Sequence, residues 1–181
     1  MREQLVPLLV SALVLTGCGG DSSNGPTGPQ DANVGGTWTY NATNLSGTVS
    51  GISISCNIEG MTMSLTQTGA TFSGSFGPSS LSCFAQGVAI DETLPGSVIV
   101  NGSVNGSNVQ FDFETSDWRN TGTASGSSMS GTVLVRLDLG TEVVTLNGNW
   151  AAARSAAAAI RSNAVGSITE RVESVLRSLP D

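Results

Sequence analysis

Apolar side chains alternate with polar ones along most of the chain between Trp38 and Trp150. The segment VQFDFE around Phe111 is one example. A period of two places every second side chain on the same face of a β-strand. The other segments with this pattern contain Trp38 and Tyr40; Met61, Met63 and Leu65; Phe72 and Phe76; Val98, Val100 and Val104; Val133, Val135, Leu137 and Leu139; and Val144, Leu146 and Trp150. The pattern predicts strands that each have one apolar and one polar face.

Short turns that contain glycine separate these segments. Gly69, Gly106 and Gly126 lie in the turn sequences TGA, NGSN and SGSS. Glycine adopts the positive φ that tight hairpins need, so we expect about eight to ten antiparallel strands. Glycine also recurs inside the strands in one motif, seen in SGTV, SGSF, NGSV, SGTV and NGNW. Such glycines suit bends at which a sheet closes on itself, which predicts an all-β, up-and-down barrel.

The direction of the apolar face separates two kinds of barrel. Alternation alone also fits an outer-membrane barrel, whose apolar face contacts lipid. Aromatic residues make up only 5% of the chain, and no clusters like an aromatic girdle are present. We therefore expect the apolar face to point inward.

The charged residues exclude several functions. The net charge is −7, and the chain contains no lysine and no histidine. A phosphate-binding surface needs positive charge, so we expect no nucleic-acid partner. Histidine and lysine are also the usual general bases, metal ligands and Schiff-base residues, and without them no serine has an obvious activating base. The sequence predicts neither an enzyme nor a metal or cofactor site.

The densest group of acids is Asp112, Glu114 and Asp117, beside Trp118 and Arg119. Asp112 and Glu114 share one strand face, which is the minimum for an acid–base pair. The flanking phenylalanines take the opposite face, which we expect to be the core. The acids are therefore expected to be solvated and structural.

The first 17 residues have the features of an export signal. Arg2 is followed by the 11-residue apolar run from Leu5 to Leu15. A membrane-spanning helix needs about 20 such residues, so this run fits a signal peptide better than a stable span. The run ends in Leu15-Thr16-Gly17-Cys18.

The sequence LTGC resembles the bacterial lipobox. The resemblance implies cleavage before Cys18 and attachment of lipid to its thiol and new amine. The alternative is an ordinary secretory signal with a cysteine near its cleavage site. The lipid reading predicts a signal at 1–17, a flexible tether at 18–34, a barrel at 35–153 and a helix at 154–181. It places the protein in the cell envelope, at the outer membrane or cell surface in preference to the inner membrane.

With Cys18 lipidated, Cys56 and Cys83 are an even pair in an exported domain. Their expected state is a disulfide. The alternative is a two-thiolate metal site, for which the sequence offers no completing ligands.

Two short motifs carry a second resemblance. Gly36-Thr37-Trp38 is similar to the G-x-W opening of the lipocalin and avidin group of barrels, and NGNWAAAR at 147–154 resembles a closing strand with Trp and Arg. The resemblance implies that Arg154 covers Trp38.

The lipocalin resemblance also implies a carrier of a small apolar ligand. The inward aromatic side chains would bind it: Trp38, Tyr40, Phe72, Phe76, Phe111, Phe113 and Trp150. The alternative is a structural or protein-interaction lipoprotein whose barrel those same side chains fill. A cavity below about 300 Å³ would favour this alternative. The sequence leaves the oligomeric state open.

The C-terminal segment has a helical period. Val165, Ile168, Val172, Val175 and Leu179 are spaced 3, 4, 3 and 4 residues apart, which is one face of a helix. We expect this face to dock on the barrel, with a coiled-coil partner surface as the alternative, since two heptads are short for pairing alone.

Overall fold

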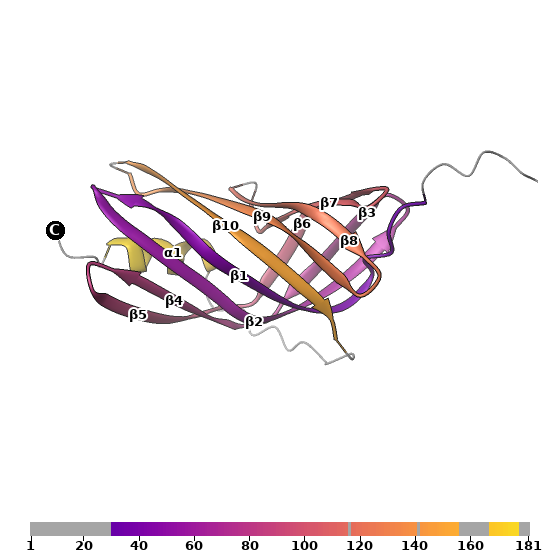
Figure 1. Cartoon of the computed structure of the whole chain (residues 1–181), viewed down its shortest axis with the longest axis horizontal. Helices are drawn as coiled ribbons and strands as arrows, with labels where there is room; N and C mark the ends of the chain where they lie inside the picture. The colour runs from indigo at the N-terminus through magenta and orange to yellow at the C-terminus, as the bar shows by residue number, and fades with distance from the viewer. Residues whose placement is uncertain (1–29, 116, 141, 156–166, 178–181) are drawn as a thin grey trace, which may run out of the picture.

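A computed structural model of the whole chain describes residues 30–115, 117–140, 142–155 and 167–177 (Figure 1). The predicted signal at 1–17, Cys18 and the tether as far as residue 29 lie outside the described residues. The described residues form ten strands and one helix. Their bounds are β1 Gly36–Val49, β2 Ile52–Thr68, β3 Thr71–Phe76, β4 Ser79–Ala85, β5 Val88–Leu94, β6 Ser97–Asn105, β7 Asn108–Phe113, β8 Trp118–Ser125, β9 Ser128–Asp138, β10 Val143–Arg154 and α1 Ile168–Arg177.

Eight of the strands close into a ring. The order around the sheet is β1-β10-β9-β8-β7-β6-β3-β2, and β2 pairs again with β1. The strand pairs in the ring are antiparallel. The turns at Gly69, Gly106 and Gly126 have φ near +59° and join neighbouring strands, as expected. The prediction of an antiparallel barrel with a C-terminal helix is confirmed.

The remaining two strands extend the barrel at one end. β2 is 17 residues long. Its C-terminal half pairs with β3, while Ile54 to Glu59 pairs with β4. β5 adds to β4 and has no other strand neighbour among the described residues. Figure 1 shows β4, β5 and α1 together at this end of the molecule.

The apolar faces point into the barrel, as predicted, but one strand departs from the simple alternation. Val98 is 51% exposed, whereas Ile99 is 1% exposed. The pairing of β6 with β7 shifts between Val100 and Ser103, and Asn101 has a φ of 55°. This bulge changes the parity within β6, so the expectation that Val98 and Val100 share the inward face of Val104 is wrong.

Glycines inside the strands allow neighbouring strands to approach closely. Gly122 of β8 is the Cα partner of Gly131 of β9. A Cβ on Gly131 would lie 1.9 Å from the carbonyl oxygen of Thr121, and one on Gly122 would lie 2.1 Å from a carbonyl oxygen of β9. Trp150 is the Cα partner of Gly131, and its Nε1 donates to the carbonyl oxygens of Thr121 and Thr132, at 3.2 and 3.1 Å.

The indole of Trp150 thus extends from β10 to both strands at the glycine pair, where the backbone of the paired strand leaves no room for a Cβ on Gly122 or Gly131. A large side chain from a neighbouring strand stabilises a strand glycine in this way. Three other strand glycines have a similar close neighbour: Gly47 with Leu146, Gly74 with Leu65 and Gly102 with Phe72. At these three positions the recurring glycine motif lies against a bulky side chain of a neighbouring strand.

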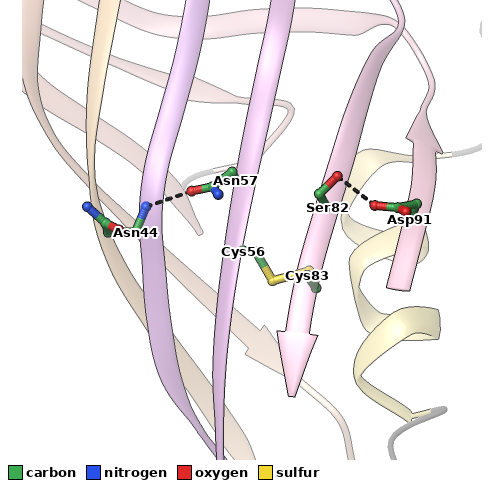
Figure 2. Close-up of a disulfide and its surroundings, with 6 residues drawn as sticks. All are labelled: Asn44, Cys56, Asn57, Ser82, Cys83 and Asp91. Atoms are coloured by element: carbon green, nitrogen blue, oxygen red, sulfur yellow. Dashed lines mark hydrogen bonds between the residues drawn. A yellow bond between two sulfur atoms is a disulfide. The ribbon is translucent and has the colours of Figure 1, made fainter. Parts of the chain in front are cut away.

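Cys56 of β2 and Cys83 of β4 form the predicted disulfide. The two residues are Cα partners, 4.0 Å apart, and both are buried. The bond fastens the two-strand extension to the ring (Figure 2).

Two hydrogen bonds continue this cross-linking across the sheet. The backbone N–H of Asn44 in β1 donates to Oδ1 of Asn57 in β2 at 3.0 Å. Ser82 of β4 donates to Asp91 of β5 at 2.6 Å. Figure 2 shows these contacts on either side of the disulfide, so contacts that involve side chains join β1, β2, β4 and β5 at this level.

The helix docks on the strands, as predicted. Ile168, Val172, Val175 and Leu176 are buried and belong to the same core cluster as the barrel interior. Val165 and Leu179, the other members of the predicted face, lie outside the described residues. No helix among the described residues is long and apolar enough to cross a membrane.

Glu114 holds the N-terminus of α1. Its Oε2 accepts a hydrogen bond from the Ser167 hydroxyl at 2.6 Å, and its Oε1 accepts from the Ile168 N–H at 3.3 Å. A carboxylate at this position satisfies a free backbone donor and interacts favourably with the helix dipole. The connection between β7 and β8 thereby anchors the helix.

Candidate functional site

The seven aromatic residues of the predicted ligand site all lie inside the barrel. Each is at most 5% exposed. Six of them, all except Trp38, form one connected group in which ring centroids lie 4.8 to 5.9 Å apart. These are the distances of packed aromatic pairs. The structure therefore brings six of the seven predicted residues together and packs them against one another.

Trp118 is an eighth interior aromatic residue. It is 1% exposed, and its ring centroid lies 6.3 Å from that of Phe113. Its buried Nε1 has no hydrogen-bond partner in the described part of the chain. In the sequence Trp118 lies beside the acidic cluster. It has the same strand parity as Asn120 and Ala124, which also face inward, and this parity could have indicated its interior position.

One polar pair lies among these rings. The Tyr40 hydroxyl donates to Oδ1 of Asn120 at 2.9 Å, and Nδ2 of Asn120 donates to the carbonyl oxygen of Phe111 at 3.5 Å. Burial raises the pKa of the Tyr40 phenol far above its usual value. The hydroxyl is therefore neutral, and it is satisfied from within the barrel.

The chain preceding β1 lies against Trp38 and Arg154. Trp38 donates from Nε1 to the carbonyl oxygen of Val34 at 2.8 Å. The Cζ of Arg154 lies 4.4 Å from the Trp38 ring centroid, and its two Nη groups donate to the carbonyl oxygens of Asn33 and Gly35. The contact implied by the lipocalin resemblance is present, and it pins residues 33–35 at this end of the barrel.

The acidic cluster is divided among three environments. Asp112 is fully buried, so the expectation that it is solvated is wrong. The bulge in β6 brings Asn101 to Asp112, and Nδ2 of Asn101 donates to its Oδ2 at 2.9 Å. Arg119 Nε lies 3.5 Å from its Oδ1. Glu114 binds α1 and Asp117 is exposed, so the three carboxylates do not converge.

Four hollows described by the structure open on the outer surface. The largest, of about 680 Å³, includes exposed Phe84 and the ends of β1, β2 and β4. The other three, of about 560, 340 and 370 Å³, include residues of β8 and β9. None of the four is lined by one of the seven predicted aromatic residues. Among the described residues, no group of three or more cysteines and acids could hold a metal ion.

Comparison with known proteins does not assign the chain to a family. The lipocalin resemblance therefore rests on Gly36-Thr37-Trp38 at the start of β1 and on the contact between Trp38 and Arg154. The chain has no significant match to a protein-family model, to a curated protein sequence or to a solved structure.

Proposed function

We propose that the protein is an exported lipoprotein, held in the cell envelope by lipid on Cys18, whose barrel is filled by its own side chains and presents its outer surface to partners. The aromatic packing inside the barrel is the observation that carries the second half of this proposal. Small barrels either hold one ligand or are filled by side chains.

The interior contacts argue against a resident ligand. Six aromatic side chains contact one another, and the Tyr40 hydroxyl and the Trp150 N–H both have partners within the protein. An apolar ligand in this space would have to separate these rings. Separating each aromatic pair costs about 0.5 to 1.5 kcal/mol beyond the free energy of its buried area. Because a ligand would have to separate several pairs, these costs add up against its entry.

The proposed anchor is supported by the sequence of the N-terminal segment and by the disulfide. LTGC follows an apolar run of signal-peptide length. The Cys56–Cys83 bond is typical of an oxidising compartment outside the cytoplasm. Multiple acyl chains on Cys18 would give stable attachment, whereas a single chain binds reversibly.

The anchor is tested by changing Cys18→Ser in the full chain expressed in a bacterial host. We expect the variant to leave the membrane fraction and its N-terminal peptide to lack acyl mass. Ser22→Ala, in the predicted tether, is the matched control and should stay membrane-bound and acylated. A Cys18→Ser protein that is processed normally and remains in the membrane would place the anchor elsewhere.

A lipocalin-like carrier is the second candidate function. It is favoured by the covering of Trp38 by Arg154 and by the unpartnered Nε1 of Trp118. Titration with a fluorescent fatty acid separates the two candidates. Saturable one-to-one binding, with energy transfer from the interior tryptophans, would establish the carrier. The packed barrel is expected to give no saturable signal.

A further inference from the structure

Three neighbouring hollows on the outer face of β8 and β9 share lining residues, and we call them together the groove. The first contains Arg119, Leu134 and Arg136, and the second shares Arg119 and Leu134 with it. The third shares Thr121 and Thr132 with the second. The groove follows β8 for about 20 Å, because a strand rises about 3.3 Å per residue. It is therefore long enough for an extended ligand.

Arg119 lies in this groove and contacts the buried carboxylate of Asp112 beneath it. Its Nε lies 3.5 Å from Oδ1 of Asp112, and the side chain of Asp112 is 1% exposed while that of Arg119 is 49% exposed. Within the part of the chain that the structure describes, that carboxylate oxygen has no hydrogen-bond partner. A buried ion pair of this kind is weak evidence for stability, because the loss of hydration offsets the attraction. The contact constrains Arg119 on the side of its Nε, which is the guanidinium atom near Asp112.

Arg136 provides a second cation at the same end of the groove. Leu134 is the Cα partner of Arg119, and Arg136 lies two residues further along the same face of β9. Leu134 is 37% exposed. No side-chain partner of Arg136 occurs among the described residues, while Asp117 contributes one carboxylate to the hollow. Two guanidinium groups beside an apolar side chain suit a carboxylate attached to a ring or chain with some apolar surface.

The rest of the groove is uncharged, and apolar atoms make up more of its exposed surface than polar atoms. Its walls carry hydroxyl and amide side chains, among them Thr121, Thr132 and Gln110, and Gly122 and Gly131 are part of its lining. Hydroxyl and amide groups both donate and accept hydrogen bonds, as the hydroxyls of a sugar do. β8 and β9 each have a strand neighbour on both sides, so an extended peptide cannot add to either as a new strand. These features favour a sugar chain over a peptide.

We propose that this groove binds an acidic oligosaccharide, with a carboxylate at Arg119 and Arg136 and neutral sugar hydroxyls along Thr121 and Thr132. The site is independent of the lipid anchor and of what the barrel contains. Because the whole chain carries a net charge of −7, its long-range field repels polyanions. Binding of such a ligand would therefore report short-range contacts in the groove.

The test measures binding of an oligogalacturonate of defined length to the full-length protein by isothermal titration calorimetry. We expect saturable binding that falls by about tenfold or more in Arg136→Gln, the loss of one charge-assisted contact. Arg136 is exposed, so this change should leave the fold intact. Arg171→Gln, an exposed arginine on α1, removes the same charge elsewhere and should bind like the unchanged protein.

Four further probes identify the ligand chemistry. The methyl ester of the same oligosaccharide should lose most of the affinity, and both galacturonate monomer and inorganic phosphate should bind far more weakly than the oligomer. Equal binding of the monomer or of phosphate would reduce the site to an anion contact and overturn the proposal. Stronger binding of an oligoglutamate peptide, equal losses in Arg136→Gln and Arg171→Gln, or no binding at all would overturn it as well.

Discussion

The guanidinium of Arg154 lies over the indole of Trp38, with Cζ 4.4 Å from the ring centroid. The two residues are Cα partners on β10 and β1, and so this contact lies at the seam where the last strand meets the first. The same guanidinium binds the carbonyl oxygens of Asn33 and Gly35. One side chain therefore ties the barrel seam to the segment that leads toward the N-terminus.

Replacing Arg154→Ala removes the cation–π contact and both carbonyl contacts. We expect the free energy of unfolding to fall by about 1 to 2 kcal/mol, because Arg154 is partly solvated. Urea unfolding followed by tryptophan fluorescence measures this. Arg154→Lys keeps the charge but has no planar fork, and it should recover only part of the loss. Full recovery with lysine would show that the planar guanidinium geometry contributes nothing beyond the positive charge and its donors.

A methyl group on Gly122 has no room in the barrel wall. Its Cβ would lie 2.1 Å from a carbonyl oxygen of β9, so the backbone must move. Gly122→Ala is expected to destabilise the protein by about 1 to 3 kcal/mol, the usual cost of overpacking. Gly35→Ala is the matched control, because its nearest atom would be 3.4 Å away. A Gly122→Ala protein as stable as the control would contradict the close approach of β8 and β9.

Tyr40 gives the barrel a defined response to alkali. It is the chain's single tyrosine, and burial raises its pKa far above the usual value of 10.0. In the unfolded chain the phenol ionises near pH 10, so stability is fully present below that pH and declines as the pH rises above it. Tyr40→Phe should lack this decline, although it leaves Asn120 Oδ1 unsatisfied at an expected cost of about 1 to 3 kcal/mol.

Ultraviolet absorbance of tyrosinate reads this residue directly. At about pH 11 the folded protein should show no tyrosinate, and the signal should appear together with loss of the near-ultraviolet circular dichroism of the tryptophans. Ionisation near pH 10 with the tryptophan signal still native would mean that the phenol is exposed to water.

Ile168 tests the docking of α1. Its side chain is fully buried, so Ile168→Asp places a charge in an apolar contact and should destabilise the whole domain by several kcal/mol. Ser174→Asp puts the same group on an exposed position of α1 and should change stability little. If Ile168→Asp melts like Ser174→Asp while the protein loses a self-association, the apolar face of α1 is a partner surface instead.

Much of the fold could be predicted because the pattern that specifies it is local. Alternation fixes which residues of a strand share a face, and the glycines at Gly69, Gly106 and Gly126 fix where the chain reverses. Both depend on neighbours in the sequence. The pairing of Cys56 with Cys83 is predicted by their even number and by the expected export of the domain, without knowledge of the strand register.

What the sequence did not reveal depends on contacts between strands. The bulge at Asn101 changes the inward residues of β6 and covers Asp112, yet nothing in the spacing of Val98 and Val100 marks it. The two halves of β2 pair with different strands, β3 and β4, and this too depends on a register that the sequence pattern does not show. The groove on β8 and β9 was missed for the same reason, because Arg119 and Arg136 are neighbours only through the pairing of Arg119 with Leu134.

The content of the barrel is the most direct test of the packed-barrel proposal. Native mass spectrometry of the protein, extracted gently from the cells that produce it, would give the mass of the barrel together with any molecule bound inside it. We expect a chain that begins at an acylated Cys18, retains the Cys56–Cys83 disulfide and carries no noncovalent apolar molecule. A stoichiometric small apolar molecule that is released on unfolding would contradict the packed interior and establish a ligand-binding barrel.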